Sequence, residues 1–295
     1  MAMIRNRTRH RLVALSLVLP FVAIFALVFA YPLFEVVRMS FTDAPLIGGG
    51  EWVGLDNYKR LFADKLFYRS LQNNGYFVLL TVVPTTVIAL TIALAVNRLS
   101  GRMQALALVL FFTPYVLPVS VVTQIWAWML DFQFGVLQPV IEFVTGKPVP
   151  VFKNPFWVMP SVAVVTIWWT NGFNVLLFLA GLRNIPAELY EAAQLDGATR
   201  AQLFRRVTWP LLWPVTALVL TLQLILQLKI FDQIYLLSEG GPFNSSYVLL
   251  LMVYREAFQL NNGGYAAAIS LVLFLLIVVI SVLQFQILRI GGKRK

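Results

Sequence analysis

The sequence predicts an all-α membrane protein with six transmembrane helices and with both termini in the cytoplasm. Three observations support this fold class. Of the 295 residues, 59% are hydrophobic and 12% are charged, whereas about 25% of the residues in soluble domains carry a charge. Six apolar stretches are long enough to cross a bilayer, which takes about 20 helical residues. Lys and Arg residues are also distributed unequally between the two sets of loops.

The six apolar stretches define the expected transmembrane helices. A cleaved signal peptide is the alternative for the first, because Arg residues precede it. Its apolar run is longer than that of a signal peptide and no small-residue cleavage site follows, so we expect a retained helix. Pro84, Pro114 and Pro118 are expected to kink the second and third helices. The stretches comprise residues 12–33, 71–96, 105–129, 156–182, 211–237 and 265–288.

The Lys and Arg residues set the expected orientation. The N-terminal tail, the second and fourth connections and the C-terminal tail together hold fourteen of them, and the opposite side holds eight. Cytoplasmic loops are enriched in these residues, so both termini are expected in the cytoplasm. The net charge of +10 then follows from membrane topology. We therefore expect a lipid environment and no nucleic-acid partner.

The composition also excludes most enzyme chemistry. The chain has no Cys and a single His, His10, which excludes thiol nucleophiles, disulfides and Ser-His-Asp triads and leaves no His-based metal site. We expect no catalytic residue and no bound metal. The expected organisation is a basic tail, first helix and external loop at 1–70, a core of five helices at 71–290, and a cytoplasmic tail at 291–295.

The fourth connection, between two predicted spans, is the most informative segment. It reads IPAELYEAAQLDGATRAQLFRRVTWPLLWP over residues 185–214. Acidic residues in the first turns of a helix are favoured by its dipole, and Gly197 is expected to end that helix. A second short amphipathic stretch at 198–207 completes a helix-turn-helix outside the bilayer. Small residues on its surface allow another protein to approach closely, and Glu191 can accept hydrogen bonds from that protein.

This loop, at about 185–210, resembles the EAA signature of binding-protein-dependent ABC importer permeases. The match comprises Glu191, Ala192, Ala193, Gly197 and Pro210 at the family's spacing. Val207 and Trp209 stand where the family has Ile and Leu. Over about residues 70–290 the chain is similar to the maltose-type sugar permease branch, as shown by Gly-Gly-Pro at 240–242 and the Gly- and Ala-rich run at 261–268. The chain is expected to resemble the larger maltose permease component without that protein's large external domain and extra N-terminal helices.

The resemblance implies a bacterial inner-membrane importer of the type I ABC permease fold. Glu191, Ala192, Ala193 and Gly197 would form the coupling helix that docks on an ATP-binding subunit dimer. The implied partners also include a second homologous permease and an extracytoplasmic solute-binding protein. The chain has no G-x-x-x-x-G-K-[ST] pattern to hold phosphates, so ATP and Mg would be bound by the partner ATPase and no cofactor by this chain.

Polar residues within the spans are the candidate solute site. Thr166, Trp169, Thr170 and Phe173 recur at helical spacing, and the combination of aromatic rings and hydroxyls is typical of sugar binding. Gln223 and Gln227 form a second stripe in the fifth stretch, and the resemblance places all six on solute-lining positions. The alternative is that such polar residues, together with Asn171 and Asn174, join helices.

Lys229 lies inside the fifth predicted span, where an unpaired charge is costly. An ion pair with Asp232, three residues later, is one interpretation. Contact with an anionic sugar is the other, and it would add Lys229 to the solute site. The sequence therefore predicts import of a sugar or sugar-like solute, with an anionic glycoside or glycerophosphate-type solute as the alternative. An ion-coupled secondary transporter or a membrane enzyme is disfavoured, because neither predicts the EAA spacing.

Overall fold

The structure, a computed structural model, describes residues 16–293, with the backbone alone for 289–293. The described residues are almost entirely helical and contain no sheet, only an isolated bridge between Thr42 and Trp52. Five helices are long and apolar enough to cross a membrane, and a bent pair brings the number to six. The N-terminal arginines, the predicted start of the first span at residue 12, and residues 294–295 lie outside the described part.

One compact unit combines the residues up to Asp64 with Val253–Val272. Its first helix covers Ser16–Met39, and every residue from Ser16 to Phe34 is exposed. The guanidinium of Arg60 lies 3.8 Å from the ring centre of Tyr265 and 3.6 Å from Glu256. The elements of this unit are η1 (Ala26–Ala30), α2 (Tyr31–Met39), α3 (Asp56–Ala63), η4 (Arg255–Gln259) and the first part of α14 (Gly263–Lys293).

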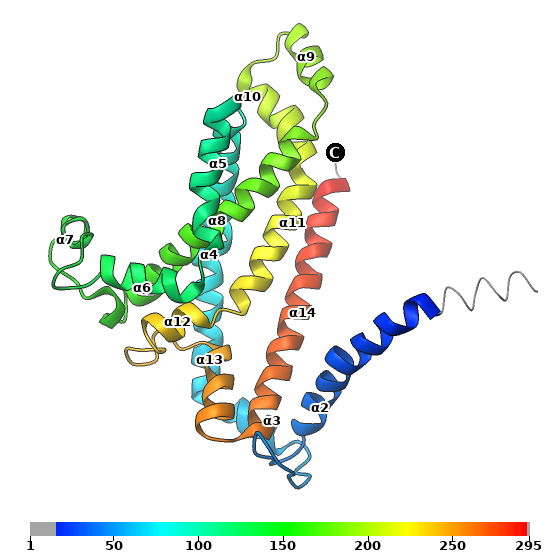
Figure 1. Cartoon of the computed structure of the whole chain (residues 1–295), viewed down its shortest axis with the longest axis vertical. Coiled ribbons are helices and arrows are strands. Elements are labelled where there is room, and N and C mark those ends of the chain that lie inside the picture. The colour runs from blue at the N-terminus through cyan, green and yellow to red at the C-terminus, as the bar shows by residue number, and fades with distance from the viewer. Residues whose placement is uncertain (1–15, 294–295) are drawn as a thin grey trace, which may run out of the picture. The chain divides into compact units, whose positions relative to one another are not determined.

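The second unit, Lys65–Met252 with Leu273–Lys295, contains the predicted loop and the polar stripes (Figure 1). Its central helix, α8 (Val158–Arg183), packs against α4 (Lys65–Val96), α5 (Gly101–Val116) and α11 (Trp209–Leu228). Gly172 allows the approach of α5, since a Cβ there would collide with the carbonyl oxygen of Phe111. A buried core joins α4, α8 and α11 through Ala89, Ala93, Val175, Phe178, Leu182, Leu212 and Val219.

Shorter helices complete the second unit. The loop after the bent pair contains α7 and a 3₁₀ turn, and the predicted coupling loop contains α9, α10 and a π-helical turn. Two more helices follow α11. These elements are α6 (Val119–Met129), α7 (Gln138–Thr145), η2 (Val151–Lys153), α9 (Ala187–Leu195), α10 (Arg200–Leu203), η3 (Phe204–Thr208), α12 (Asp232–Leu237) and α13 (Leu249–Tyr254).

The third predicted span, at 105–129, is not one straight helix. The chain bends by 99° between α5 and α6, visible in Figure 1. The break falls at Leu117, which has an extended backbone with φ −69° and ψ 138°. Pro118 explains this, because a proline disfavours the helical conformation of the residue before it and has no N–H to donate. The kink expected at Pro118 is confirmed, and it is large enough to break the span.

The fifth predicted span, at 211–237, ends earlier than expected. α11 stops at Leu228, and α12 starts only at Asp232. Asn74 of α4 stabilises this end, because its Nδ2 donates to the carbonyl oxygen of Leu228 at 3.1 Å. Its Oδ1 accepts a hydrogen bond from the Leu249 amide at 2.9 Å. Lys229 therefore lies in a break and not on a helix that it shares with Asp232.

Candidate functional site

Gly197 ends α9 and reverses the direction of the chain. Its φ is +77°, in the left-handed region that glycine adopts without a steric penalty. The Gly197 amide donates to the carbonyl of Gln194 at 3.0 Å, and the Ala198 amide donates to that of Ala193 at 2.9 Å. These two bonds form a Schellman motif, which satisfies carbonyls at the helix end. The predicted helix break at Gly197 is confirmed.

The helix after this turn starts at a well-formed N-cap. The Thr199 hydroxyl accepts from the Gln202 amide, and the Gln202 side chain accepts from the Thr199 amide at 2.7 Å. This capping box satisfies two amides at the helix start. The helix then continues through η3 into the membrane span as one helix, Arg200–Leu228. The predicted amphipathic stretch at 198–207 is thus helical from Arg200 and leads into the span without a loop. The π-helical turn η3 lies directly before Pro210, which has no N–H to donate.

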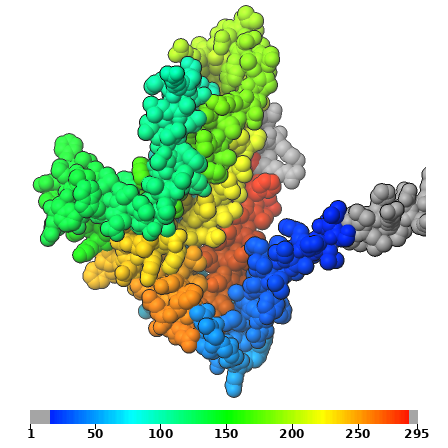
Figure 2. Space-filling view, in the orientation of Figure 1, coloured from blue at the N-terminus to red at the C-terminus, as the bar shows by residue number. Residues whose placement is uncertain are grey.

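The predicted coupling residues lie on an open surface. Glu191, Ala192 and Gly197 are exposed, and Ala193 is half-buried. Leu195, beside them, is 89% exposed. The segment lies at the far end of the second unit, beyond the ends of α5 and α8 (Figures 1 and 2). The residues of the predicted coupling surface are therefore largely accessible in this structure.

A chain of buried amide side chains joins α8 to α11. Gln227 Nε2 donates to Gln223 Oε1 at 2.9 Å, and Gln223 Nε2 donates to Asn174 Oδ1 at 3.1 Å. Asn174 Nδ2 in turn donates to the carbonyl oxygen of Thr170 at 3.2 Å. The chain ends at Gln227 Oε1, which accepts no hydrogen bond from the described residues. In this conformation Gln223 joins α11 to α8, as the alternative interpretation of the stripe predicts, whereas Gln227 bonds to Gln223 within α11.

The four residues of the α8 stripe are also engaged within the chain. Thr166 and Thr170 are buried, and each hydroxyl donates to the backbone carbonyl four residues earlier. Trp169 Nε1 donates to the carbonyl of Leu117 at 3.1 Å, and the Phe173 ring stacks on Tyr115 with 5.2 Å between ring centres. The aromatic residues thus face the break between α5 and α6.

Asn171 differs from its neighbours. It is 6% exposed, and neither Nδ2 nor Oδ1 of its buried amide has a hydrogen-bond partner. The Thr85 hydroxyl on α4 is also buried and unpaired. Buried polar groups without a partner are rare and costly in proteins. Asn171 and Thr85 therefore mark a place where this conformation leaves polar groups unsatisfied.

Lys229 and Asp232 do not form the ion pair considered above. Both residues are exposed, and no ion pair joins them. The reason is the break after Leu228, which removes the helical spacing that would bring the two side chains together. The ion-pair interpretation was wrong, and the ammonium of Lys229 is accessible at the end of α11.

Two residues that the sequence analysis did not single out, Asn73 and Asn74, position the ends of neighbouring helices. Asn73 Nδ2 donates to the carbonyls of Asn244 and Tyr247 at 2.9 and 2.8 Å. Asn74 holds the ends of α11 and α13, as described above. Two consecutive amides within an apolar stretch were the available signal, because polar groups at membrane depth need partners.

Comparisons with known proteins agree with this architecture. The model of the family "Binding-protein-dependent transport system inner membrane component" matches residues 85–289. The sulfoquinovosyl glycerol transport system permease protein SmoG of Agrobacterium fabrum is 31% identical over 281 residues, which are 95% of this chain and 91% of that protein. The trehalose/maltose transport system permease protein MalF of Thermococcus litoralis is 32% identical over 246 residues, 83% and 82% of the two chains.

A solved structure shows the same fold. A chain of a bacterial ABC transporter involved in the import of the acidic polysaccharide alginate superposes with a TM-score of 0.86 and 23% sequence identity. The match covers 98% of this chain and 99% of that one. The predicted all-α permease fold is thus confirmed. Because the family model covers most of the chain, the protein is a multi-pass inner-membrane protein that belongs to the family of binding-protein-dependent transport system inner membrane components.

Proposed function

We propose that this chain is the permease subunit of an ABC importer that moves a sugar or sugar-like solute into the cytoplasm. The observation that carries the proposal is its similarity to permeases named for sugars. Their names refer to sulfoquinovosyl glycerol, trehalose and maltose, arabinooligosaccharides, and multiple sugars. This range supports the solute class and does not select one member of it.

The energy would come from ATP hydrolysis by a separate subunit dimer. The exposed face of α9, with Glu191, Ala192 and Gly197, is the proposed docking surface for that dimer. The second proposed partner is a homologous permease, which the resemblance to the maltose-type permeases implies. An extracytoplasmic binding protein would deliver the solute, as the family name implies.

The proposed solute site comprises Thr166, Trp169, Thr170, Phe173, Gln223, Gln227 and Lys229. In the conformation described, the first six of these residues make contacts within the chain. Asn171, beside the stripe, has two buried polar atoms without a hydrogen-bond partner among the described residues. Movement of α11 against α8 would release further amide groups for a solute hydroxyl. Binding would then exchange hydrogen bonds within the chain for bonds to the solute.

An anionic glycoside is the second candidate solute. It is favoured by the accessible, unpaired ammonium of Lys229 at the end of α11. The sulfoquinovosyl group in the name of one relative is such an anion. A positive charge beside the solute path would favour it through charge-assisted hydrogen bonds.

The test is solute uptake by the complete complex reconstituted in proteoliposomes with its binding protein. We expect uptake of maltose, trehalose or sulfoquinovosyl glycerol to require both ATP inside the vesicles and the binding protein outside. Uptake driven by an ion gradient without ATP would instead indicate a secondary transporter. Failure of every sugar, with ATP hydrolysis still stimulated by another loaded binding protein, would exclude the proposed solute class.

A further inference from the structure

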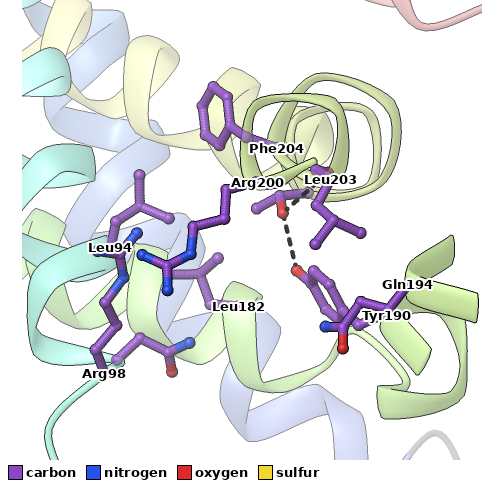
Figure 3. Close-up of a pocket in the computed structure, with 10 residues that line it drawn as sticks. Leu94, Arg98, Leu182, Tyr190, Gln194, Arg200, Leu203 and Phe204 are labelled. Carbon is purple, nitrogen blue, oxygen red and sulfur yellow. Dashed lines mark hydrogen bonds between the residues drawn. The ribbon is translucent and has the colours of Figure 1, made fainter. Parts of the chain in front are cut away.

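A pocket of about 740 Å³ lies between α9 and the ends of the membrane helices (Figure 3). Its walls come from four separate segments: the end of α4, the end of α8, α9, and the start of the helix Arg200–Leu228. None of the proposed solute-binding residues lines it. The lining residues are Leu94, Asn97, Arg98, Leu182, Tyr190, Gln194, Arg200, Leu203, Phe204 and Thr208.

The charge of this lining is strongly one-sided. It includes two arginines, Arg98 and Arg200, and no carboxylate. Neither guanidinium forms an ion pair or donates a hydrogen bond to any residue that the structure describes. Figure 3 shows both side chains turned into the pocket, one from the α4–α5 turn and one from α10. Two positive charges in one pocket repel each other, and an anion bound between them would offset that repulsion.

The apolar and the polar residues of the pocket lie at different positions along the membrane helices. Leu94 and Leu182 are close to the last apolar residues of their spans, and Asn97 and Arg98 follow directly after the first of these spans. The apolar wall thus lies at the level where the hydrocarbon region ends, and the arginines lie at the level of the lipid headgroups. Basic pockets between membrane helices at this level bind phosphate-containing headgroups.

We propose that Arg98 and Arg200 bind a phosphate-bearing anion in this pocket, either the headgroup of an anionic phospholipid or a soluble phosphate ester. Arginine suits this ligand because its planar fork of N–H donors matches the geometry of a phosphate. Gln194 and Asn97 supply further donors without partners among the described residues. The Tyr190 hydroxyl is 3.0 Å from that of Thr208 and ties α9 to the same wall.

The bound anion joins parts of the chain that would otherwise contact each other weakly. Arg98 belongs to the membrane core, whereas Arg200 belongs to the segment beside α9. An anion held by both therefore holds the predicted coupling loop against α4 and α8. Binding does not depend on the proposed function. Its consequence, tighter coupling between ATP hydrolysis and transport, rests on that function.

The experiment uses the complete complex and two separate probes. Native mass spectrometry from mixed micelles measures retention of phosphatidylglycerol against phosphatidylcholine. Thermal unfolding measures stabilisation by glycerol 1-phosphate against glycerol. We expect saturable binding of at least one phosphate probe and none of the neutral ones. Arg98→Gln and Arg200→Gln should each weaken it about tenfold, because each removes a charge-assisted hydrogen bond. The double variant should lose it.

The matched control variants lose the same positive charge as the test variants but do not alter the pocket. Arg102→Gln and Arg206→Gln alter exposed arginines from the same two segments, outside the pocket lining, and should bind as the unmodified chain does. Arg200→Lys should bind detectably but more weakly, since it keeps the charge and loses the fork. Equal binding by the double variant and the controls would overturn the proposal. The proposal would also be overturned if the double variant, and none of the others, failed to assemble with the ATPase. That result would show that the arginines bind acidic groups of the ATPase.

Discussion

The indole Nε1 of Trp169 donates a hydrogen bond to the backbone carbonyl oxygen of Leu117 at 3.1 Å. This contact joins α8 to the point where the third span breaks. Leu117 cannot use a helical donor, because Pro118 interrupts the helix there. A side chain predicted to bind solute thus also stabilises the break between α5 and α6, and the two roles are separable by substitution.

Trp169→Phe is expected to lower the stability of the complex by about 1–3 kcal/mol, because it leaves the Leu117 carbonyl without its donor. The aromatic ring remains, so stacking on a sugar is preserved. The measurement is the thermal unfolding midpoint in detergent. Trp168→Phe is the control, since Trp168 is half-exposed beside it and makes no bond to Leu117. Equal shifts in the two variants would show that the hydrogen bond contributes nothing.

Replacing Gln223 by Leu is expected to affect mainly stability, and replacing Gln227 by Leu mainly solute uptake. Gln223→Leu breaks two bonds of the amide chain and should destabilise the complex by about 1 kcal/mol, at about 0.6 kcal/mol for each bond in a membrane protein. Gln227→Leu breaks one bond and should mainly reduce solute uptake. Thr221→Val, on the same helix and outside the chain, is the control. Normal uptake by Gln227→Leu would assign the stripe to helix packing alone.

Gly197→Trp should uncouple ATP hydrolysis from transport. No atom beyond its chain neighbours lies within 4 Å of a Cβ built at Gly197, so the added bulk itself would not collide with the rest of the chain, while the left-handed φ of +77° strains any residue with a Cβ. Gly197→Asn should have a smaller effect, because asparagine tolerates the left-handed conformation that φ +77° requires. The measurement is the stimulation of ATP hydrolysis by the loaded binding protein. Full stimulation in an assembled Trp variant would remove α9 as the docking surface.

Lys229→Met should assemble normally, because the side chain is exposed and has no ion-pair partner among the described residues. If the solute is anionic, its uptake should fall about tenfold with the loss of one charge-assisted contact. Uptake of a neutral disaccharide should not change. Lys147→Met, at an exposed loop position, is the matched control. A parallel loss of both solutes would exclude recognition of charge by Lys229.

The apolar runs predicted most of the membrane helices closely. The stretch at 71–96 corresponds to Lys65–Val96, and that at 156–182 to Val158–Arg183, because burial in lipid depends on local composition. The end of α11 was not predictable in this way. It is set by Asn74, whose amide reaches Leu228 across 154 positions. A hydrophobic run alone cannot indicate which distant side chain will cap a helix.

The helical spacing predicted which polar residues share a face of a helix, but not which residues they contact. Helical spacing correctly placed Thr166 and Thr170 on one face, and Gln223 one turn from Gln227. It gave no information on what each face meets. Asn174 accepts a hydrogen bond from the Gln223 amide, and the Tyr115 ring stacks on the Phe173 ring. The size of the bend at Pro118 could not be predicted either. The group that donates to the freed Leu117 carbonyl is Trp169, which lies on another helix.

The continuous helix from Arg200 to Leu228 has a mechanical consequence. With 29 residues and a rise of about 1.5 Å per residue, it is a rod about 43 Å long. Gln223 lies about 34 Å along this helix from Arg200. A tilt of about 5° around Arg200 therefore moves Gln223 by about 3 Å. A movement of that size takes the Gln223–Asn174 hydrogen bond from 3.1 Å to beyond hydrogen-bonding distance. A small change in the tilt of this helix at the loop end is thus sufficient to break a contact inside the membrane.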